Sequence, residues 1–396
     1  MSKPGKTALI LTGGGARAAY QVGVLQALQL IRRDAGEKRR TSPFRIICGT
    51  SAGALNAMAL ASRADHYDLA LRAMVEVWRD FRTEQVYRSD SFGVIQSGAK
   101  WLTLFSLGWA VARWRRARPR SLLDNEPLRE LLPHLFDMER LPDLMAKGHI
   151  DAVAVTGSSY TSGEHVTYYD SAEPIEPWTR SQRLAVPTAL SHEHLLASAA
   201  IPFVFPAIRI HREYFGDGSM RQIAPISPAI HLGATKVLII GAGRMGEKGE
   251  QAPTHTPNYP SLAQVAGHAM SGIFLDGLSA DIERINRVNQ TLSVLNDEQR
   301  RHTPLKPIRT LVISPSQRID GIASRHVGSL PRPIRTMLGG IGATEARGSA
   351  LASYLLFEQS FTRELIALGE SDTYAKREEV LAFFEPDTAQ LLQASA

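Results

Sequence analysis

The chain has 396 residues, 44% of them hydrophobic, and a formal net charge of +6. This length and apolar content exclude a disordered chain and suffice for one large α/β domain or two smaller ones. No run reaches the about 18 uncharged apolar residues of a membrane-spanning helix, and no secretory signal is visible. The single cysteine, Cys48, excludes an intrachain disulfide. We therefore expect a cytoplasmic protein, soluble or peripherally associated with a membrane.

Short apolar runs alternate with helical patterns up to about Pro315. This alternation predicts an α/β fold with a mainly parallel central sheet and helices on both faces. The predicted strands are Lys6 to Thr12, Phe44 to Gly49, Asp151 to Thr156, His165 to Asp170, Lys236 to Gly241 and Arg309 to Ser314. The predicted helices are Arg17 to Arg32, Ala52 to Ser62, Tyr67 to Phe81, Pro127 to Leu135, Glu193 to Ala199, Leu262 to Leu278 and Ser279 to Asn296.

The strand pattern ends after Pro315. A Pro- and Gly-rich segment follows from Gly328 to Gly342, and then a helical pattern from Glu345 to Leu368. We therefore predict a main domain over residues 1–320 and, over residues 321–396, a helical C-terminal extension or cap that packs on it.

A glycine-rich turn follows the first predicted strand. Gly13, Gly14 and Gly15 lead into Ala16 and Arg17, where the first helix begins. Consecutive glycines allow backbone N–H groups to point into a cavity, and the helix behind them adds its dipole. Such a turn can bind a phosphate, or it can stabilise the oxyanion that forms when a serine attacks an ester.

The same turn matches part of a dinucleotide-binding pattern. Gly13, Gly15 and Ala18 have the G-x-G-x-x-A spacing after a strand. Dinucleotide folds also place an acidic residue at the end of the second strand, where it binds the ribose. The second predicted strand here ends instead in the uncharged residues Cys48 to Ser51. Nucleotide binding is therefore the weaker of the two interpretations, and it stays open.

The segment Gly49-Thr50-Ser51-Ala52-Gly53 has the G-x-S-x-G pattern of a nucleophile elbow. Its glycines permit a strand to reverse into a helix within about three residues. Ser51 would then stand at the N-terminus of a helix, where free N–H groups favour negative charge. Gly15 and Ser51 follow consecutive strands joined by one helix, so we expect both at the same edge of the sheet.

A serine nucleophile needs a base, and a conventional triad would use a histidine. The histidines in or beside the predicted elements fit surface or core positions better: His192, His194, His211 and His268. Asp217 is the better candidate, because glycines flank it in a tight turn after an extended run. The alternative is that this Asp-Gly pair only forms the turn.

Together these motifs resemble the patatin-like phospholipase family. The resemblance rests on the glycine turn Gly13 to Arg17, the elbow Gly49 to Gly53 and the pair Asp217-Gly218, in the order of the family. The segment Ser198 to Pro206 is also similar to the one that precedes the aspartate in that family. The resemblance does not extend beyond about residue 320.

Two positions depart from the family pattern. Ala18 stands where the family often has glycine, and it adds a methyl group near the expected anion site. Ser219 stands where the family has glycine or alanine, and it leaves Asp217 intact.

The resemblance implies a three-layer sandwich fold and a lipid acyl hydrolase, such as a phospholipase A or a lysophospholipase. It implies that Ser51 attacks the acyl carbonyl, that Asp217 takes its proton, and that the oxyanion hole lies in the Gly13 to Arg17 loop, with the N–H groups of Gly14, Gly15 and Ala16 as donors. An aspartate with an ordinary pKa of about 3.9 is a weak base, so it must contact the serine directly and be partly desolvated. For the Arg17 side chain we expect anchoring of the loop through a carboxylate rather than a direct role at the oxyanion.

An uncharged run from Trp101 to Ala112, followed by an arginine cluster, suits the headgroup boundary of a membrane. A core helix or a cap over the site is an equal alternative. We expect a lipid ester or phospholipid as substrate, peripheral membrane contact through Trp101 to Arg120, and no cofactor, metal ion or nucleic acid. The competing hypothesis is a catalytically idle or regulatory protein of the same fold that binds a lipid or a nucleotide.

Overall fold

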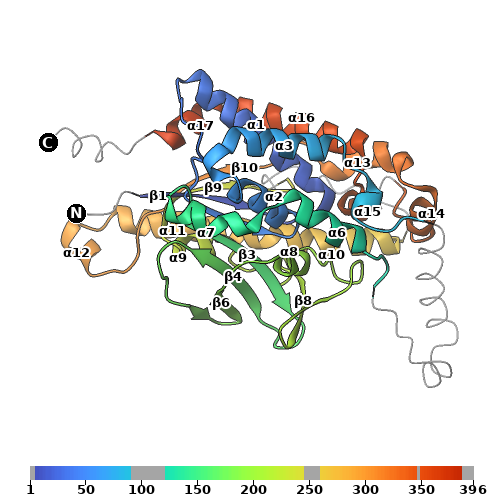
Figure 1. Cartoon of the computed structure of the whole chain (residues 1–396), viewed down its shortest axis with the longest axis horizontal. Helices are drawn as coiled ribbons and strands as arrows, with labels where there is room; N and C mark the ends of the chain where they lie inside the picture. The colour runs from blue at the N-terminus through green and yellow to red at the C-terminus, as the bar shows by residue number, and fades with distance from the viewer. Residues whose placement is uncertain (1–4, 91–120, 245–258, 346–347, 386–396) are drawn as a thin grey trace.

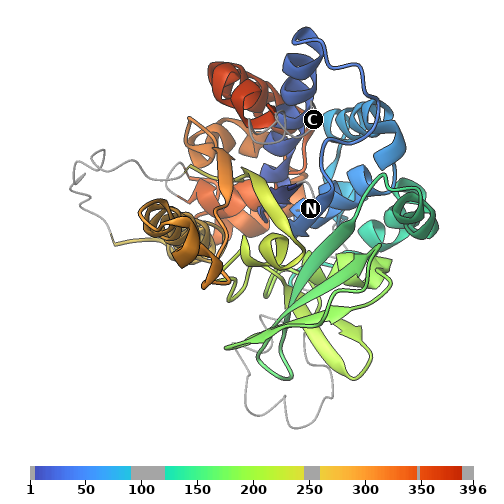
Figure 2. The same ribbon diagram turned by 90° about the vertical axis from the view of Figure 1, so that its left-hand side faces the viewer.

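A sheet of ten strands lies between two layers of helices in the residues that the computed structural model describes, which are 5–90, 121–244, 259–345 and 348–385 (Figures 1 and 2). The strand order is β10-β9-β1-β2-β3-β4-β6-β5, and β8 pairs with both β3 and β7. The strands are β1 (Lys6–Leu11), β2 (Ile46–Thr50), β3 (Ala152–Ser159), β4 (His165–Ser171), β5 (Thr179–Arg180), β6 (Arg183–Pro187), β7 (Ile208–Ile210), β8 (Glu213–Asp217), β9 (Ala234–Ile240) and β10 (Arg309–Ile313).

The helices of the described residues come from the whole length of the chain. They are α1 (Ala19–Asp34), α2 (Ala52–Ala61), α3 (Tyr67–Arg79), α6 (Glu126–Leu135), α7 (Leu141–Ala146), α8 (His192–Ser198), α9 (Ser227–His231), α10 (Leu262–Ser271), α11 (Gly277–Ser293), α12 (Asp297–Arg301), α13 (Ile319–His326), α14 (Arg332–Gly340), α15 (Ser349–Leu355), α16 (Gln359–Ala375) and α17 (Arg377–Phe384).

The sheet is mixed but mainly parallel, as predicted. Strands β10, β9, β1, β2 and β3 all pair in parallel, and β4 then pairs antiparallel to β3. The list of predicted strands did not include β5, β6, β7 or β8, although an extended run was expected before Asp217, where β8 lies. Two of these, β5 and β7, are shorter than the about four to eight residues over which strand alternation can be recognised.

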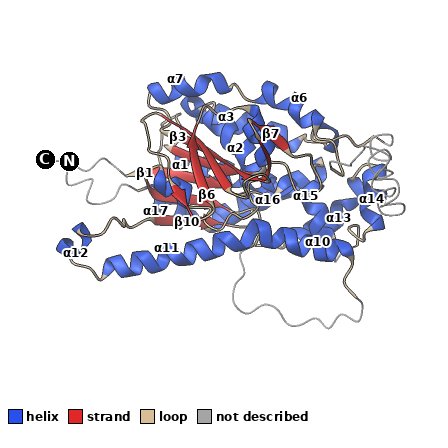
Figure 3. Ribbon diagram, turned by 90° about the horizontal axis from the view of Figure 1, so that it is seen from below, coloured by secondary structure: helices blue, strands red, loops and turns tan. Residues whose placement is uncertain are grey.

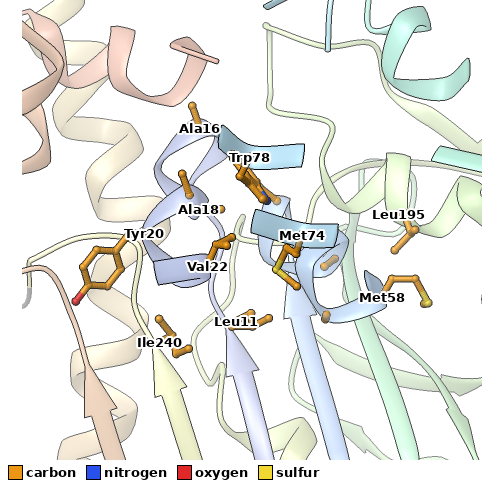
Figure 4. Packing of buried hydrophobic residues seen from close by; sticks show 14 of the residues in the cluster. Leu11, Ala16, Ala18, Tyr20, Val22, Met58, Met74, Trp78, Leu195 and Ile240 are labelled. Carbon is orange, nitrogen blue, oxygen red and sulfur yellow. The ribbon is translucent and has the colours of Figure 1, made fainter. Parts of the chain in front are cut away.

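Alternate residues of the central strands face opposite sides of the sheet. Leu11 of β1 packs on one side with α1, α2, α3 and α16, whereas Ile10 packs on the other side with α9 and α11. Figure 4 shows the first side, where Leu11 and Ile240 lie near Val22 of α1. The helices therefore cover both faces, which confirms the predicted three-layer arrangement.

Helix α16 lies along α1 (Figure 1). Glycines allow the two helix backbones to touch: a Cβ atom on Gly23 would lie 1.9 Å from the carbonyl oxygen of Ile366, and one on Gly369 would lie 2.3 Å from that of Tyr20. Side chains of α16 also belong to the same hydrophobic cluster as those of α1, α2 and α3. The division of the chain into domains at residue 320 stays a prediction.

The predicted helix from Glu345 to Leu368 was wrong in its continuity. Helix α15 ends at Leu355 and α16 begins at Gln359, because Glu358 between them pairs with Arg82 in an isolated β-bridge. The Pro- and Gly-rich segment also contains a helix, α14, whose prolines lie at its N-cap and in its first turn, where proline is tolerated.

The predicted pair of helices over Leu262 to Asn296 is one long rod (Figure 3). A π-helical turn, Gly272–Asp276, joins α10 to α11, and the break predicted between Leu278 and Ser279 lies inside α11. The turn includes Phe274, whose ring stacks on Tyr354 of α15 at 4.9 Å between ring centroids. π-Helical turns are frequent at functional sites, and this one places the Phe274 ring beside the glycine-rich turn, 2.8 Å from the position of a Cβ atom on Gly13.

Candidate active site

Ser51 lies in a sharp turn between β2 and α2. Its φ of 55° and ψ of −132° fall in a region that non-glycine residues rarely adopt, at a cost of about 1–3 kcal/mol. The neighbouring glycines have no room for a side chain. A Cβ atom would lie 2.5 Å from the Cα of Ala54 if added to Gly49, and 2.3 Å from the carbonyl oxygen of Leu11 if added to Gly53. The turn is thus packed directly against its own helix and against β1.

The Ser51 hydroxyl donates a hydrogen bond to Oδ2 of Asp217 at 2.5 Å. Asp217 is the last residue of β8, and it reaches the serine because β8 pairs antiparallel with β3, opposite Gly157. Its other oxygen, Oδ1, accepts the N–H of Ser219 at 2.8 Å. Ser51 is 1% exposed and Asp217 is fully buried. The structure therefore brings together the two residues that the sequence singled out.

Burial raises the pKa of Asp217 to about 6, although the hydrogen bonds from Ser51 and Ser219 oppose this rise. Desolvation disfavours the charged carboxylate, and a carboxylate with a higher pKa is a stronger base. Asp217 is therefore ionised at neutral pH and better able to accept a proton than an exposed aspartate.

We expect ester hydrolysis to decline as the pH falls below 6, because protonated Asp217 cannot accept the proton of Ser51. Above pH 6 the carboxylate is ionised and the rate should level off. The measurement is kcat/KM between pH 4 and 8 at constant ionic strength. A midpoint near pH 4, which is the ordinary range of an aspartate, would contradict this assignment.

The last residue of α8 and the segment that follows it hold both residues in place. The N–H of Ser51 donates to Oγ of Ser198 at 2.9 Å, and this hydroxyl is fully buried. The N–H groups of Gly218 and Asp217 donate to the carbonyls of Ser198 and Ala200 at 3.1 and 2.9 Å. This role of Ser198 was not predicted, since nothing local in the sequence connects it with a residue 147 positions away.

Replacing Ser198 with alanine should lower kcat about tenfold with little change in KM, because an unsatisfied buried N–H costs about 1–3 kcal/mol and lies next to the nucleophile. Ser198→Thr keeps the hydroxyl and should retain more activity than Ser198→Ala. Ser191→Ala is the matched control: it removes the N-cap of the same helix without touching Ser51. Equal kcat values for Ser198→Ala and the wild type would argue against a positioning role.

The glycine-rich turn lies at the end of β1, beside the elbow, because β1 and β2 pair in parallel with Leu11 opposite Gly49. The N–H of Arg17 is occupied by the carbonyl of Gly14 at 3.1 Å. Within the described ranges, no protein hydrogen bond uses the N–H groups of Gly14, Gly15 or Ala16. Three backbone donors are therefore available, whereas that of Arg17 is not.

Each glycine of the turn is required by close packing. A Cβ atom on Gly13 would lie 2.2 Å from Oγ of Ser219, and one on Gly14 would lie 2.6 Å from Cβ of Ala242. Gly15 has a φ of 55°, and its Cβ would lie 2.2 Å from the carbonyl oxygen of Tyr354. The shape of the turn thus depends on residues from three distant parts of the chain.

Arg17 points away from the serine and toward α15. Its Nε donates to Oγ of Ser353 at 2.7 Å, its Nη2 donates to the carbonyl of Ala350 at 3.2 Å, and its guanidinium lies 4.0 Å from the ring centroid of Tyr354. The loop is anchored through a hydroxyl, a carbonyl and an aromatic ring, whereas the carboxylate of Asp320 interacts with Arg17 only electrostatically and no ion pair joins them in the described residues. The side chain holds the glycine-rich turn against the C-terminal part of the chain.

His165 supports the other side of the site. Its Nε2 lies 2.9 Å from the carbonyl oxygen of Gly218, and burial lowers its pKa to about 4, so it is neutral and donates this hydrogen bond. In the described residues, no histidine forms a hydrogen bond with Ser51 or Asp217. The sequence marked His165 only as the start of a strand, because the pairing that brings β4 and β8 to β3 has no local signal.

A cavity of about 140 Å³ opens beside Ser51. Apolar side chains from α2, α3 and α6 make up most of its lining, together with Phe205 and Phe357. Gly15 and Ser51 are part of this lining, so the nucleophile and the glycine-rich turn meet one apolar space.

Two negative findings concern only the described residues. Among them, no helix is both long and apolar enough to pass through a bilayer. They also contain no group of three or more His, Cys, Asp or Glu side chains that could hold a metal ion. The segment Trp101 to Arg120 lies outside the described residues, so membrane contact there is untested.

A family model described as patatin-like phospholipase matches residues 9–230. The chain belongs to the patatin-like phospholipase family. The matched region contains the glycine-rich turn, the serine elbow and Asp217, and it ends within α9.

This patatin-like chain is also 29% identical over 217 residues to a cGAMP-activated phospholipase of Pseudomonas aeruginosa. The alignment covers 55% of this chain and 53% of the relative, so the chain spans about half the length of that protein.

Two solved structures are similar in outline. VipD of Legionella pneumophila matches 92% of this chain and 67% of its own at 14% identity, with a TM-score of 0.34. The type III effector ExoU of Pseudomonas aeruginosa matches 89% of this chain and 78% of its own at 16% identity, with a TM-score of 0.28. Both TM-scores are low, and these likenesses are weak.

Proposed function

We propose that this patatin-like protein is a serine lipid acyl hydrolase that uses Ser51 and Asp217 as a dyad. The observation that carries the proposal is the 2.5 Å hydrogen bond from the Ser51 hydroxyl to a buried carboxylate, beside an apolar cavity. A nucleophile within hydrogen-bond distance of its base is the signature of covalent catalysis.

In the first half of the reaction, Oγ of Ser51 attacks the carbonyl carbon of the ester while its proton passes to Asp217. The carbonyl oxygen becomes an oxyanion, which accepts hydrogen bonds from the N–H groups of Gly14, Gly15 and Ala16. The intermediate then collapses to an acyl-serine, and the alcohol leaves with the proton from Asp217.

In the second half, water attacks the acyl-serine, and Asp217 takes a proton from the water. The same donors stabilise the second oxyanion. Collapse releases the fatty acid, and Ser51 regains its proton from Asp217. The apolar lining supports a lipid acyl group as the substrate, because such a chain gains about 0.8 kcal/mol for each methylene that leaves water.

A fluorophosphonate probe tests this proposal, since it labels an activated serine and leaves an idle one unmodified. We expect labelling of the Ser51 peptide, detected by mass spectrometry, and release of fatty acid from phosphatidylcholine and phosphatidylglycerol vesicles. Ser51→Ala is the control for both readouts. Absence of labelling together with absence of released fatty acid would favour an idle or regulatory protein.

A second proposal concerns regulation by a nucleotide. The relative from Pseudomonas aeruginosa is named a cGAMP-activated phospholipase. We propose that labelling of Ser51 in this chain depends on a cyclic dinucleotide, and the probe reaction with and without cGAMP tests it. Equal labelling rates would reject this dependence.

Peripheral membrane contact through Trp101 to Arg120 is a third element of the proposal. It predicts co-sedimentation with anionic vesicles that weakens when Trp101, Trp109 and Arg115 are replaced by alanine. Unchanged co-sedimentation would exclude this segment as the contact.

A further inference from the structure

The cavity beside Ser51 follows α2 along its whole length. Ser51 precedes the helix, Ala52, Leu55 and Ala59 line the cavity from successive turns, and Arg63 lines it just beyond the C-terminus. Residues three or four apart share one face of a helix, so these side chains form a continuous stripe. With a rise of 1.5 Å per residue, the distance from Ser51 to Arg63 is about 18 Å.

Helix α3 gives the facing side of the cavity. It returns along α2 after a short turn, and the indole N–H of Trp78 on α3 donates to Oδ1 of Asn56 on α2 at 2.8 Å. Trp78, Met74 and Ala70 line the cavity at four-residue spacing, with Ala70 in the first turn of α3, close to Arg63 in sequence. Helices α2 and α3 therefore line the same length of the cavity, with Ser51 and Trp78 toward one end and Arg63 and Ala70 toward the other.

Helix α6 gives the third side. Leu128, Leu132 and Leu135 line the cavity from successive turns, and His134 lines it near the end of the helix. The three helices thus enclose an elongated space rather than a round one. Among the lining residues that these three helices contribute, the one buried polar side chain is that of Asn56. It forms hydrogen bonds with the Ala18 carbonyl, Gln21 and Trp78.

The two ends of this space differ in chemistry. Ser51 and Gly15 stand at one end, and Arg63 and His134, which are both exposed, stand at the other. In the described part of the chain, no carboxylate forms an ion pair with Arg63. An acyl chain in the cavity would therefore extend from the nucleophile, over apolar side chains, to an end that is charged and hydrated.

We propose that α2 acts as a ruler for the acyl chain. The inference rests on the proposed function: the ester carbonyl lies at Ser51, and the chain extends along α2 toward Arg63. An extended alkyl chain advances about 1.3 Å per carbon, given a C–C bond of about 1.5 Å, so about 14 carbons fill the distance. Carbons beyond Arg63 and His134 return to water and add no binding.

For the wild type, we expect kcat/KM to rise with the length of the acyl chain and then to stop rising at a defined length, the break of the profile. For 4-nitrophenyl esters below their micelle concentration, kcat/KM should rise about fourfold for each added carbon, which corresponds to about 0.8 kcal/mol per methylene. The rise should stop at about 12–14 carbons. A profile that is flat from eight to sixteen carbons would overturn the ruler.

Two variants shorten the cavity by different amounts. Ala59 lies about 12 Å along α2 from Ser51, so Ala59→Phe should move the break to about nine carbons. Ala70 lies near the far end, so Ala70→Phe should move the break by only a few carbons from the wild-type position. Both variants should still hydrolyse the butanoate ester, whose chain ends before either phenyl ring.

Ala146→Phe, at an exposed position in α7, is the matched control and should keep the wild-type profile. If Ala59→Phe does not fold, Ala70→Phe carries the test by itself. If a folded variant still hydrolyses the butanoate ester and its profile breaks at the same chain length as that of the wild type, α2 does not measure the acyl chain. That outcome would leave the proposed hydrolase function unaffected. Absence of hydrolysis and of fluorophosphonate labelling in the wild type would instead refute the proposed function.

Discussion

Ser51→Ala and Asp217→Asn are each expected to lower kcat for ester hydrolysis by at least about 10³-fold. The first variant removes the nucleophile. The second removes the proton acceptor, while its amide still fits the buried site at the end of β8. Because the two residues act as a unit through one hydrogen bond, the double variant should be no slower than the slower single variant.

The measurement is kcat on a soluble ester, with circular dichroism and thermal unfolding to verify the fold. Asp143→Asn, at an exposed position in α7, is the control for a change of carboxylate to amide and should retain wild-type activity. Activity within tenfold of the wild type in either site variant would exclude the dyad.

Gly53→Ala is expected to lower the free energy of unfolding by about 3 kcal/mol or more. The added methyl group would lie 2.3 Å from the carbonyl oxygen of Leu11 and 2.5 Å from that of Thr12. Both atoms belong to the backbone that leads into the glycine-rich turn, so neither can move without displacing that turn. The measurement is the urea midpoint, with activity measured in parallel.

Gly321→Ala is the matched control for this substitution. Gly321 lies in α13, and no atom lies within 4 Å of the position of its added Cβ. Alanine is favoured over glycine in a helix by about 1 kcal/mol, so this variant should be as stable as the wild type or slightly more so. A Gly53→Ala protein as stable as Gly321→Ala would show that α2 is not held against β1.

The sequence predicted the parts of the site that depend on local structure. The glycine-rich turn and the serine elbow each follow a buried strand and open a helix, so a short stretch of residues contains the whole signal. Their proximity also followed from one rule, that consecutive strands joined by a helix pair in parallel. The choice of Asp217 depended on the absence of a suitable histidine and on the family resemblance.

The parts that the sequence could not predict are long-range contacts. Asp217 reaches Ser51 through the antiparallel pairing of β8 with β3, and no pattern within β8 announces that pairing. The hydrogen bond from Ser51 to Ser198 and that from His165 to Gly218 arise from the same pairing region. The hydrogen-bond partners of Arg17 were not predicted for the same reason, since they lie 336 and 333 positions away in the sequence.

The contact between Arg17 and Ser353 joins residues 336 positions apart. Tyr354 closes the space around Gly15 from the same late segment. The turn at the start of the chain therefore cannot reach its final shape until nearly all of the described chain has been translated and packed. A nascent chain on the ribosome therefore contains Ser51 early, but its glycine-rich turn takes its final shape only after Ser353 and Tyr354 have been made. For a protein proposed to cleave lipids, this order separates synthesis from catalysis in time.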